Sequence, residues 1–284
     1  MPIDPTCCLD ELGVPRDLSG LRALDIGAWD GPYTFELERR GAEVTALDIQ
    51  DPDITVFNAV KKIKKSSATH VRCSIYDALP EALGTYDLVL FAGVYYHLKN
   101  PVLSLQRIRR LLKDEGNLFI EGASGTDYLA AELNKMLGLQ KSSIDSTAKL
   151  IDTLPLAYFD ADHKIYNDWS NWWFPTTRCL EELLLDSGFR NIDLKLRTTA
   201  FTNYIGRRLL GRAEADPAKP DPGAQNHEHY LATGKERPPP TNENFHQGRF
   251  ERLLSRLPRP LHPTAKRVRA AVRQSLDSYR RRSL

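Results

Sequence analysis

The eight residues LDIGAWDG, at positions 24–31, constrain the fold of this chain more than any other stretch. The apolar run at 23–26 predicts a buried strand, and Gly27 and Gly31 predict a tight turn directly after it. Pro32 follows, and proline suits the first position of a helix. A strand, a glycine turn and a helix in direct succession are typical of α/β proteins.

Strand-like and helical segments keep alternating through the first 124 residues. Expected strands lie at 23–27, 43–49, 70–75, 86–93 and 116–124, with helices at 32–40, 53–64 and 101–112. Apolar strands joined by helical crossovers predict a mostly parallel sheet that is covered on both faces. Beyond an insert, the alternation resumes with a helix at 176–187 and strands at 191–197 and 202–210. The last two strands predict a hairpin, so the final strand should be antiparallel to the others.

Composition divides the chain into three parts. Residues 1–212 form the predicted α/β domain, in which 125–173 is an insert with helical and aromatic-rich segments. Residues 213–248 are rich in proline and polar residues, which is typical of a linker. Residues 249–284 hold 11 of the 39 basic residues but two of the 37 acidic ones. This basic amphipathic tail therefore carries a net charge of about +9, and the rest of the chain about −7.

The charge distribution limits the expected partners. An acidic body is a poor surface for nucleic acid, whose binding depends on neutralising phosphates, so a nucleic-acid partner is not expected. The tail has three interpretations: contact with an anionic membrane, docking to an acidic partner or to the acidic body, or a solvated extension.

Cellular location and metal content follow from simpler features. No apolar run reaches the roughly 20 residues of a membrane span, and the N-terminus lacks the basic-then-apolar pattern of a signal peptide. We therefore expect a cytoplasmic protein, with peripheral membrane association through the tail as an option. The four cysteines show no CxxC spacing, which favours reduced structural thiols and no metal site.

Two acids follow the first two predicted strands. The turn reads Asp-x-Gly-x-x-x-Gly, so Asp25 offers a carboxylate that suits a cationic amino-acid group better than a diphosphate. Asp48 ends the second strand, 21 residues after Gly27, the spacing at which a carboxylate reaches a ribose diol. An amino acid and a ribose in one cleft indicate S-adenosylmethionine (SAM). As alternatives, Asp25 could cap the helix that begins near Pro32, and Asp48 could be a loop carboxylate.

Three stretches, LDIGAWDGPYTFELERRGA, YDLVLFAGVYYHLKNP and SNWWFPTTRCLEELLLDSGF, resemble class I SAM-dependent methyltransferases. Within that class they are most similar to the branch related to the enzymes that modify the tRNA wobble uridine with a carboxymethyl group. The resemblance covers about residues 20–210 and implies a Rossmann-like sheet of seven strands with a C-terminal antiparallel hairpin. The branch also includes bacterial enzymes that methylate sugars and secondary metabolites.

The resemblance assigns further residues to the cofactor. It implies that Gly27 and Gly31 keep the turn free of side chains and that Asp77 contacts the adenine amino group, with an ordinary turn as the alternative for Asp77. Further residues are expected to line the methionine side or to form walls of the pocket. They are Trp29, Tyr33, Phe91, Ala92 and Gly93.

The acceptor side is expected in two places. His97 follows the fourth strand and could act as the base for an alcohol acceptor, or else pack against or cap the next helix. Of the adjacent Tyr95 and Tyr96, at most one should face the cleft, and Tyr96 is the second catalytic candidate. The cluster Asn171, Trp172 and Trp173 could hold a sugar or a flat ring, or close the insert over its own apolar underside.

These features predict a SAM-dependent methyltransferase that methylates the oxygen of a sugar, a glycan or a small hydroxylated metabolite. The first alternative is an enzyme that transfers a methyl or carboxymethyl group to the tRNA wobble uridine, using the basic tail to hold phosphates. The second is a SAM-binding protein without catalytic activity.

Overall fold

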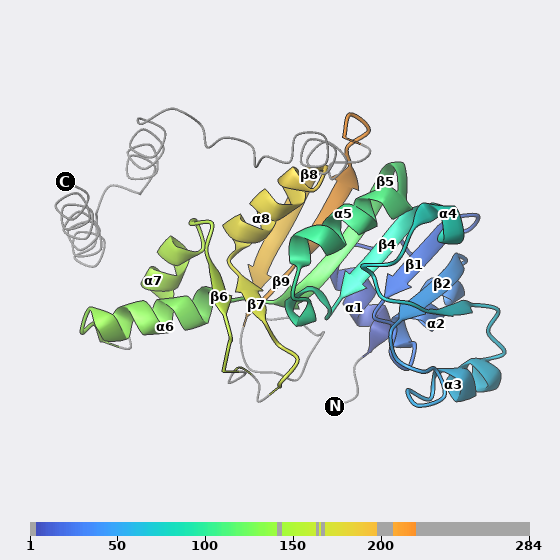
Figure 1. Ribbon diagram of the computed structural model, residues 1–284, viewed down its shortest axis with the longest axis horizontal. Coiled ribbons are helices and arrows are strands. Elements are labelled where there is room, and N and C mark those ends of the chain that lie inside the picture. Colours follow the sequence, from blue (N-terminus) through green and yellow to red (C-terminus); the bar gives the residue numbers. More distant parts are fainter. Residues whose placement is uncertain (1–3, 141–143, 163–164, 166–167, 198–206, 220–284) are drawn as a thin grey trace, which may run out of the picture.

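The computed structural model describes residues 4–140, 144–162, 165, 168–197 and 207–219. A seven-stranded sheet in the order β3-β2-β1-β4-β5-β9-β8 forms its centre (Figure 1). The strands are β1 (Arg22–Ile26), β2 (Glu43–Asp48), β3 (Thr69–Arg72), β4 (Tyr86–Ala92), β5 (Leu112–Ala123), β8 (Phe189–Arg197) and β9 (Arg208–Ala215). The first five pair in parallel, whereas β9 lies antiparallel between β5 and β8. The predicted fold class is confirmed.

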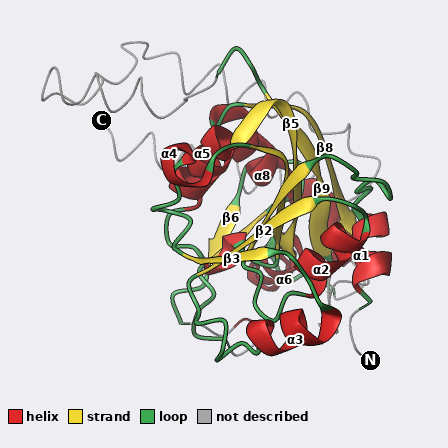
Figure 2. Ribbon diagram, turned by 90° about the vertical axis from the view of Figure 1, so that its right-hand side faces the viewer, coloured by secondary structure: helices red, strands yellow, loops and turns green. Residues whose placement is uncertain are grey.

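Helices cover both faces of this sheet (Figure 2). One layer holds α1 (Pro5–Glu11), α2 (Pro32–Arg39) and α3 (Phe57–Lys64), and the other holds α4 (Pro80–Leu83), α5 (Pro101–Leu111) and α8 (Thr177–Asp186). Successive side chains of a strand point to opposite faces, so Leu24 and Ile26 pack with α5 and α8, and Ala23 packs with α1 and α2. Asp25 therefore lies on the face that α1 and α2 cover.

Several boundaries differ from the prediction. α3 begins at Phe57 rather than at residue 53, because Val56 adopts the left-handed φ of 61° and cannot continue a helix. β5 begins at Leu112, four residues early, directly after α5. β9 extends to Ala215, so the predicted domain boundary at residue 212 falls inside a strand. The predicted start of that strand and most of the predicted linker and tail lie outside the described residues.

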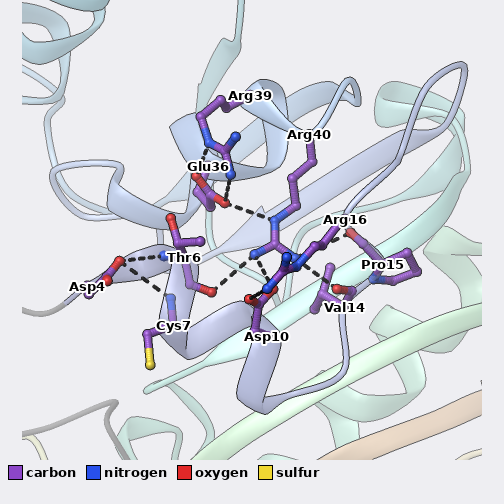
Figure 3. Close-up of polar contacts among 10 residues, drawn as sticks. All are labelled: Asp4, Thr6, Cys7, Asp10, Val14, Pro15, Arg16, Glu36, Arg39 and Arg40. Atoms are coloured by element: carbon purple, nitrogen blue, oxygen red, sulfur yellow. Dashed lines mark hydrogen bonds and ion pairs between the residues drawn. The ribbon is translucent and has the colours of Figure 1, made fainter.

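The helix α1 was not predicted, and a buried arginine joins it to α2 (Figure 3). The Arg40 guanidinium donates from Nε to Glu36 at 2.9 Å and from Nη1 to the Val14 carbonyl oxygen at 2.8 Å. Its Nη2 donates to the Thr6 carbonyl oxygen at 3.1 Å and to Asp10 at 2.9 Å. Because these partners satisfy the buried cation from both helices, Arg40 fixes α1 against the sheet face that carries Asp25.

The insert forms a small lobe beside the main sheet (Figure 1). It contains α6 (Thr126–Met136), α7 (Ile144–Ile151) and the antiparallel strands β6 (Ala157–Phe159) and β7 (Trp173–Pro175). The predicted helices are present, but the two-stranded sheet was not expected. Among the residues that the structure describes, no helix combines the length and the apolarity that crossing a bilayer requires.

Candidate active site

The predicted cofactor residues meet at the carboxyl ends of β1, β2 and β4. β1 lies between β2 and β4 in the sheet, so the chain leaves neighbouring strands toward opposite sides at this point. Such a switch point is where open α/β sheets bind ligands. The structure thus brings Asp25, Gly27, Asp48 and Gly93 to one end of the sheet, as the sequence predicted.

Asp48 holds the glycine turn against the end of β2. One carboxylate oxygen accepts the Trp29 backbone N–H at 2.9 Å, and the other accepts the Gln50 backbone N–H at 2.8 Å. A carboxylate offers about four acceptor sites, so these two bonds leave capacity for the two hydroxyls of a ribose. Trp29 itself is exposed to 57% and has a left-handed φ of 51°. Because the side chain is exposed, the indole stays a candidate for the predicted pocket wall.

Asp25 is more deeply buried than the prediction of a cleft carboxylate implied. Its side chain is 2% exposed and accepts a hydrogen bond from the Thr34 hydroxyl at 2.6 Å, in the first turn of α2. This contact fits the alternative in which Asp25 supports the start of the helix. Burial raises the pKa of Asp25 to about 6, with the nearby Asp48 as a further cause and the Thr34 hydrogen bond opposing the rise. Contact with an ammonium group stays a prediction.

The raised pKa makes that prediction testable by pH. If the ammonium of the ligand lies near Asp25, it favours the ionised carboxyl, and binding expels the proton that Asp25 carries below pH 6. We expect the affinity for S-adenosylhomocysteine (SAH) to rise up to about tenfold between pH 5 and pH 7, measured by calorimetry. Asp25→Asn should remove this dependence. An equal pH dependence in wild type and variant would contradict the role.

Gly27 packs closely against the side chain of Val94. A Cβ built on Gly27 would lie 2.4 Å from Val94 Cγ2, and its φ is 76°. Gly31 is buried, with a φ of 87°, and directly precedes the first residue of α2. The turn therefore has no room for a side chain at Gly27 even before a ligand enters.

Gly20 supplies a matched control, because its φ is also 76° but a Cβ added there would meet no atom within 4 Å. We expect Gly27→Ala to lower the free energy of unfolding by about 1–3 kcal/mol more than Gly20→Ala does, as overpacking adds to backbone strain. Urea unfolding measures both. Adding Val94→Ala should recover most of the difference. Equal losses in the two single variants would contradict the contact.

Three predicted pocket residues fit their roles less well. The Phe91 side chain is fully buried in the core, so its backbone at the end of β4 is the part left to line the methionine side, and that role stays a prediction. Tyr33 packs against the core beneath α1, where it hydrogen-bonds Cys8 and burial raises the pKa of its hydroxyl. Asp77 is exposed in a turn, in which its N–H donates to the Ser74 carbonyl oxygen at 3.0 Å. The turn predicted as the alternative for Asp77 is therefore present.

His97 ends the short 3-10 helix η1 (Tyr95–His97), which is the next element after β4. Its ring is half-buried, and Nδ1 lies 2.9 Å from the hydroxyl oxygen of Ser170. Burial lowers the pKa of His97, whereas the nearby Asp168 opposes that shift. His97 does not cap the next helix, because the side chain of Asn100 accepts the Leu103 N–H at the start of α5.

The two neighbouring tyrosines are both buried. The Tyr95 hydroxyl donates to the Ala123 carbonyl oxygen at 2.7 Å. The Tyr96 hydroxyl accepts from Arg208 Nη2 at 3.3 Å and would lie 3.8 Å from a Cβ added to Gly93. Of the pair, Tyr96 is therefore the one whose hydroxyl lies near the end of β4.

Arg208 and Glu121 form a buried ion pair that the sequence analysis missed. Their side chains are 5% and 1% exposed, and Arg208 Nη2 donates to Glu121 Oε2 at 3.2 Å. Burial raises the pKa of Glu121, and the Arg208 charge opposes the rise. Among the residues that the structure describes, none hydrogen-bonds the buried Arg208 Nη1. The signal in the sequence was charge inside two apolar segments, NLFIEGA and RRLLG, but the sequence does not show that they pair.

The aromatic cluster of the insert packs partly on itself. Asn171 does not fit the predicted acceptor contact, because its side chain is 1% exposed and its amide donates to the Ile165 carbonyl oxygen at 3.0 Å. Trp173 Nε1 donates to the Lys99 carbonyl oxygen at 3.1 Å, and Lys99 Nζ lies 4.4 Å from the Trp172 ring centroid. Both indoles remain half-buried rather than fully enclosed. They stay candidates for contact with an acceptor.

Comparison with known proteins identifies the class of enzyme. A family model described as a methyltransferase domain matches residues 24–120, which contain the glycine turn, Asp48 and His97. The solved 1,6-didemethyltoxoflavin-N1-methyltransferase of Burkholderia thailandensis, with bound SAH, aligns with a TM-score of 0.50 at 18% identity over 75% of this chain and 76% of that one. Magnesium protoporphyrin IX methyltransferase from Synechocystis PCC 6803, with bound SAH, gives a TM-score of 0.50 at 16% identity over 75% and 81%. Both show the same fold.

Two curated relatives carry more specific names. A ubiquinone biosynthesis O-methyltransferase from Xanthomonas oryzae pv. oryzae (strain PXO99A) is 27% identical over 177 residues, 57% of this chain and 74% of the relative. A tRNA U34 carboxymethyltransferase from Pseudoalteromonas translucida is 26% identical over 179 residues, 63% of this chain and 47% of the relative. Together, the matched domain and these relatives identify a SAM-dependent methyltransferase, and the solved structures share its class I fold.

Proposed function

We propose that this methyltransferase methylates the oxygen of a small hydroxylated acceptor, a sugar, a glycan or a ring-bearing metabolite. The observation that carries the proposal is the position of His97, a half-buried imidazole in η1, the next element after β4, which contacts the aromatic insert through Ser170. A hydroxyl becomes acidic as it is methylated, so a base near the methyl group accelerates the transfer. The similarity to a ubiquinone biosynthesis O-methyltransferase supports transfer to oxygen.

The residues divide the work as follows. Asp48 accepts hydrogen bonds from the ribose hydroxyls, and the Asp25 carboxylate attracts the ammonium group of the methionine part. The closed glycine turn keeps the backbone near the methionine part. When bound, SAM would supply an electrophilic methyl group on a sulfonium sulfur. That sulfur departs as a neutral thioether, so the transfer needs no acid. His97 accepts the acceptor proton, while the faces of Trp172 and Trp173 hold the acceptor ring in line.

The test offers purified protein and methyl-tritiated SAM to cell extract divided into RNA, lipid-glycan and small-molecule pools. We expect label in the glycan or small-molecule pool, and the label should resist treatments that cleave methyl esters. Asp48→Ala should abolish labelling of every pool. Label confined to the RNA pool would overturn the proposal.

Arg208 favours a second candidate, transfer to the tRNA wobble uridine. Its buried Nη1 has no hydrogen-bond partner in the described part of the chain, and its Nη2 donates to the Tyr96 hydroxyl beside the end of β4. An unpaired buried donor is costly, and a carboxylate on the transferred group or the acceptor would satisfy it. A carboxymethyl donor has such a group, which fits the similarity to a tRNA U34 carboxymethyltransferase. Labelling of tRNA by a carboxymethyl donor but not by SAM would favour this candidate.

A further inference from the structure

We propose that Asp168 and Ser170 are positioning residues that hold the His97 ring as the tautomer with its proton on Nδ1. They belong to the aromatic-rich loop of the insert, more than 70 residues after His97 in the sequence. The Ser170 hydroxyl oxygen lies 2.9 Å from His97 Nδ1 and 2.6 Å from Asp168 Oδ1. This inference rests on the proposed role of His97 as the base.

A count of protons fixes the direction of the two hydrogen bonds. The Ser170 hydroxyl has one proton, and an ionised carboxylate can only accept. The short contact to Asp168 therefore uses that proton, and the Ser170 oxygen is left to accept from His97. Nδ1 must then carry the ring proton in the neutral imidazole, so Nε2 is the nitrogen with the free electron pair.

The backbone holds this arrangement in place. The Ser170 backbone N–H also donates to Asp168 Oδ1, at 2.9 Å. This carboxylate oxygen therefore accepts two hydrogen bonds from Ser170. Two residues on, the Trp172 backbone N–H donates to the Tyr96 carbonyl oxygen at 2.8 Å. The loop is thereby bonded to η1 at two neighbouring points, through Ser170 to His97 and through Trp172 to Tyr96, and the His97 ring cannot rotate without breaking the Ser170 bond.

The chain of hydrogen bonds from Asp168 through Ser170 to His97, here called the relay, has a consequence for catalysis. When Nε2 accepts the acceptor proton, Nδ1–H still donates to Ser170, and Asp168 favours the imidazolium that forms. Arg208 acts in the opposite sense, since its charge disfavours the imidazolium. The insert thus supplies both a wall for the acceptor and the groups that orient the base. The sequence alone does not show that Asp168 and Ser170 meet His97, because the contact joins distant parts of the chain.

The tautomer can be measured without any acceptor. Long-range ¹⁵N–¹H correlation spectra at pH 8 distinguish protonated from unprotonated ring nitrogens, and His97→Asn assigns the His97 signals among the seven histidines. We expect a protonated Nδ1 and an unprotonated Nε2 in the wild type, and a mixture of both tautomers in Ser170→Ala. A wild-type ring protonated on Nε2 would overturn the proposal, whatever the enzyme methylates.

Initial rates of tritium transfer from saturating SAM to whole extract give the second readout. Ser170→Ala and Asp168→Asn should each lower the rate about 10–100-fold, with the KM for SAM within twofold of wild type. Asp193→Asn, which removes an exposed carboxylate 3.2 Å from Lys195 on β8, is the control and should leave the rate unchanged. If His97→Asn alone slows transfer, the relay is wrong but the base is right. If His97→Asn leaves the rate unchanged, the proposed base is wrong, and the spectra still decide the tautomer.

Discussion

Replacing Arg208 with methionine is expected to lower the free energy of unfolding by about 3–5 kcal/mol, the usual loss when one partner of a buried ion pair is removed. The variant leaves Glu121, which is 1% exposed, with a buried carboxylate and no cation beside it. Since burial already raises the pKa of Glu121, the loss should be smaller at pH 5, where protonation neutralises the carboxyl. Urea unfolding at pH 5 and pH 7.5 measures both effects.

Two further variants make this result specific to the pair. In Arg208→Met with Glu121→Leu, neither charge of the pair remains, and the double variant should recover most of the lost stability. Lys195→Met removes one partner of an exposed ion pair with Asp193 on β8 and should cost about 0–1 kcal/mol. If the losses from Arg208→Met and Glu121→Leu simply add in the double variant, the two side chains are not coupled as the structure shows.

Replacing His97 with asparagine is expected to slow methyl transfer about 10²–10⁴-fold, the range that general-base catalysis contributes. The asparagine amide can still donate a hydrogen bond to the Ser170 hydroxyl oxygen, so the insert should remain docked, but it cannot take a proton at neutral pH. The affinity for SAH should stay within about threefold, because the residues predicted to hold the cofactor are unchanged. Tritium transfer to extract and calorimetry with SAH measure the two quantities. A rate within threefold of wild type would rule out His97 as the base.

The main sheet could be predicted because β1, β2, β4 and β5 each contain a short apolar run, and segments with an apolar helical face alternate with them. Gly27 and Pro32 likewise mark a turn and a helix start by local chemistry alone. α1 was missed although its signal is local: Asp4 accepts the Thr6 N–H at 3.0 Å, and Pro5 is the first helical residue. The pair β6 and β7 has three residues in each strand, too few for a periodic pattern.

The site was predictable only where it follows the ends of strands. Asp48 and Gly93 come directly from that rule, and so does the placement of His97. The side-chain partners could not be predicted, because Glu121 and Arg208 are 87 residues apart and His97 and Ser170 are 73 apart. The burial of the Asn171 and Phe91 side chains could not be predicted either, since a sequence position beside a cleft does not show which way a side chain points.

Titration of the protein with SAH tests the central claim, that the cleft between β1, β2 and β4 holds the cofactor through Asp48. Asp48→Ala is compared with Asp51→Ala, which removes a nearby carboxylate that pairs with Arg72 at 3.1 Å. Thermal unfolding first shows that both variants are folded. We predict that SAH binds the Asp48 variant about 10–100-fold more weakly than wild type, the loss of hydrogen bonds to a charged group, and the Asp51 variant within twofold. Equal affinity of all three proteins would contradict the assignment of the cleft.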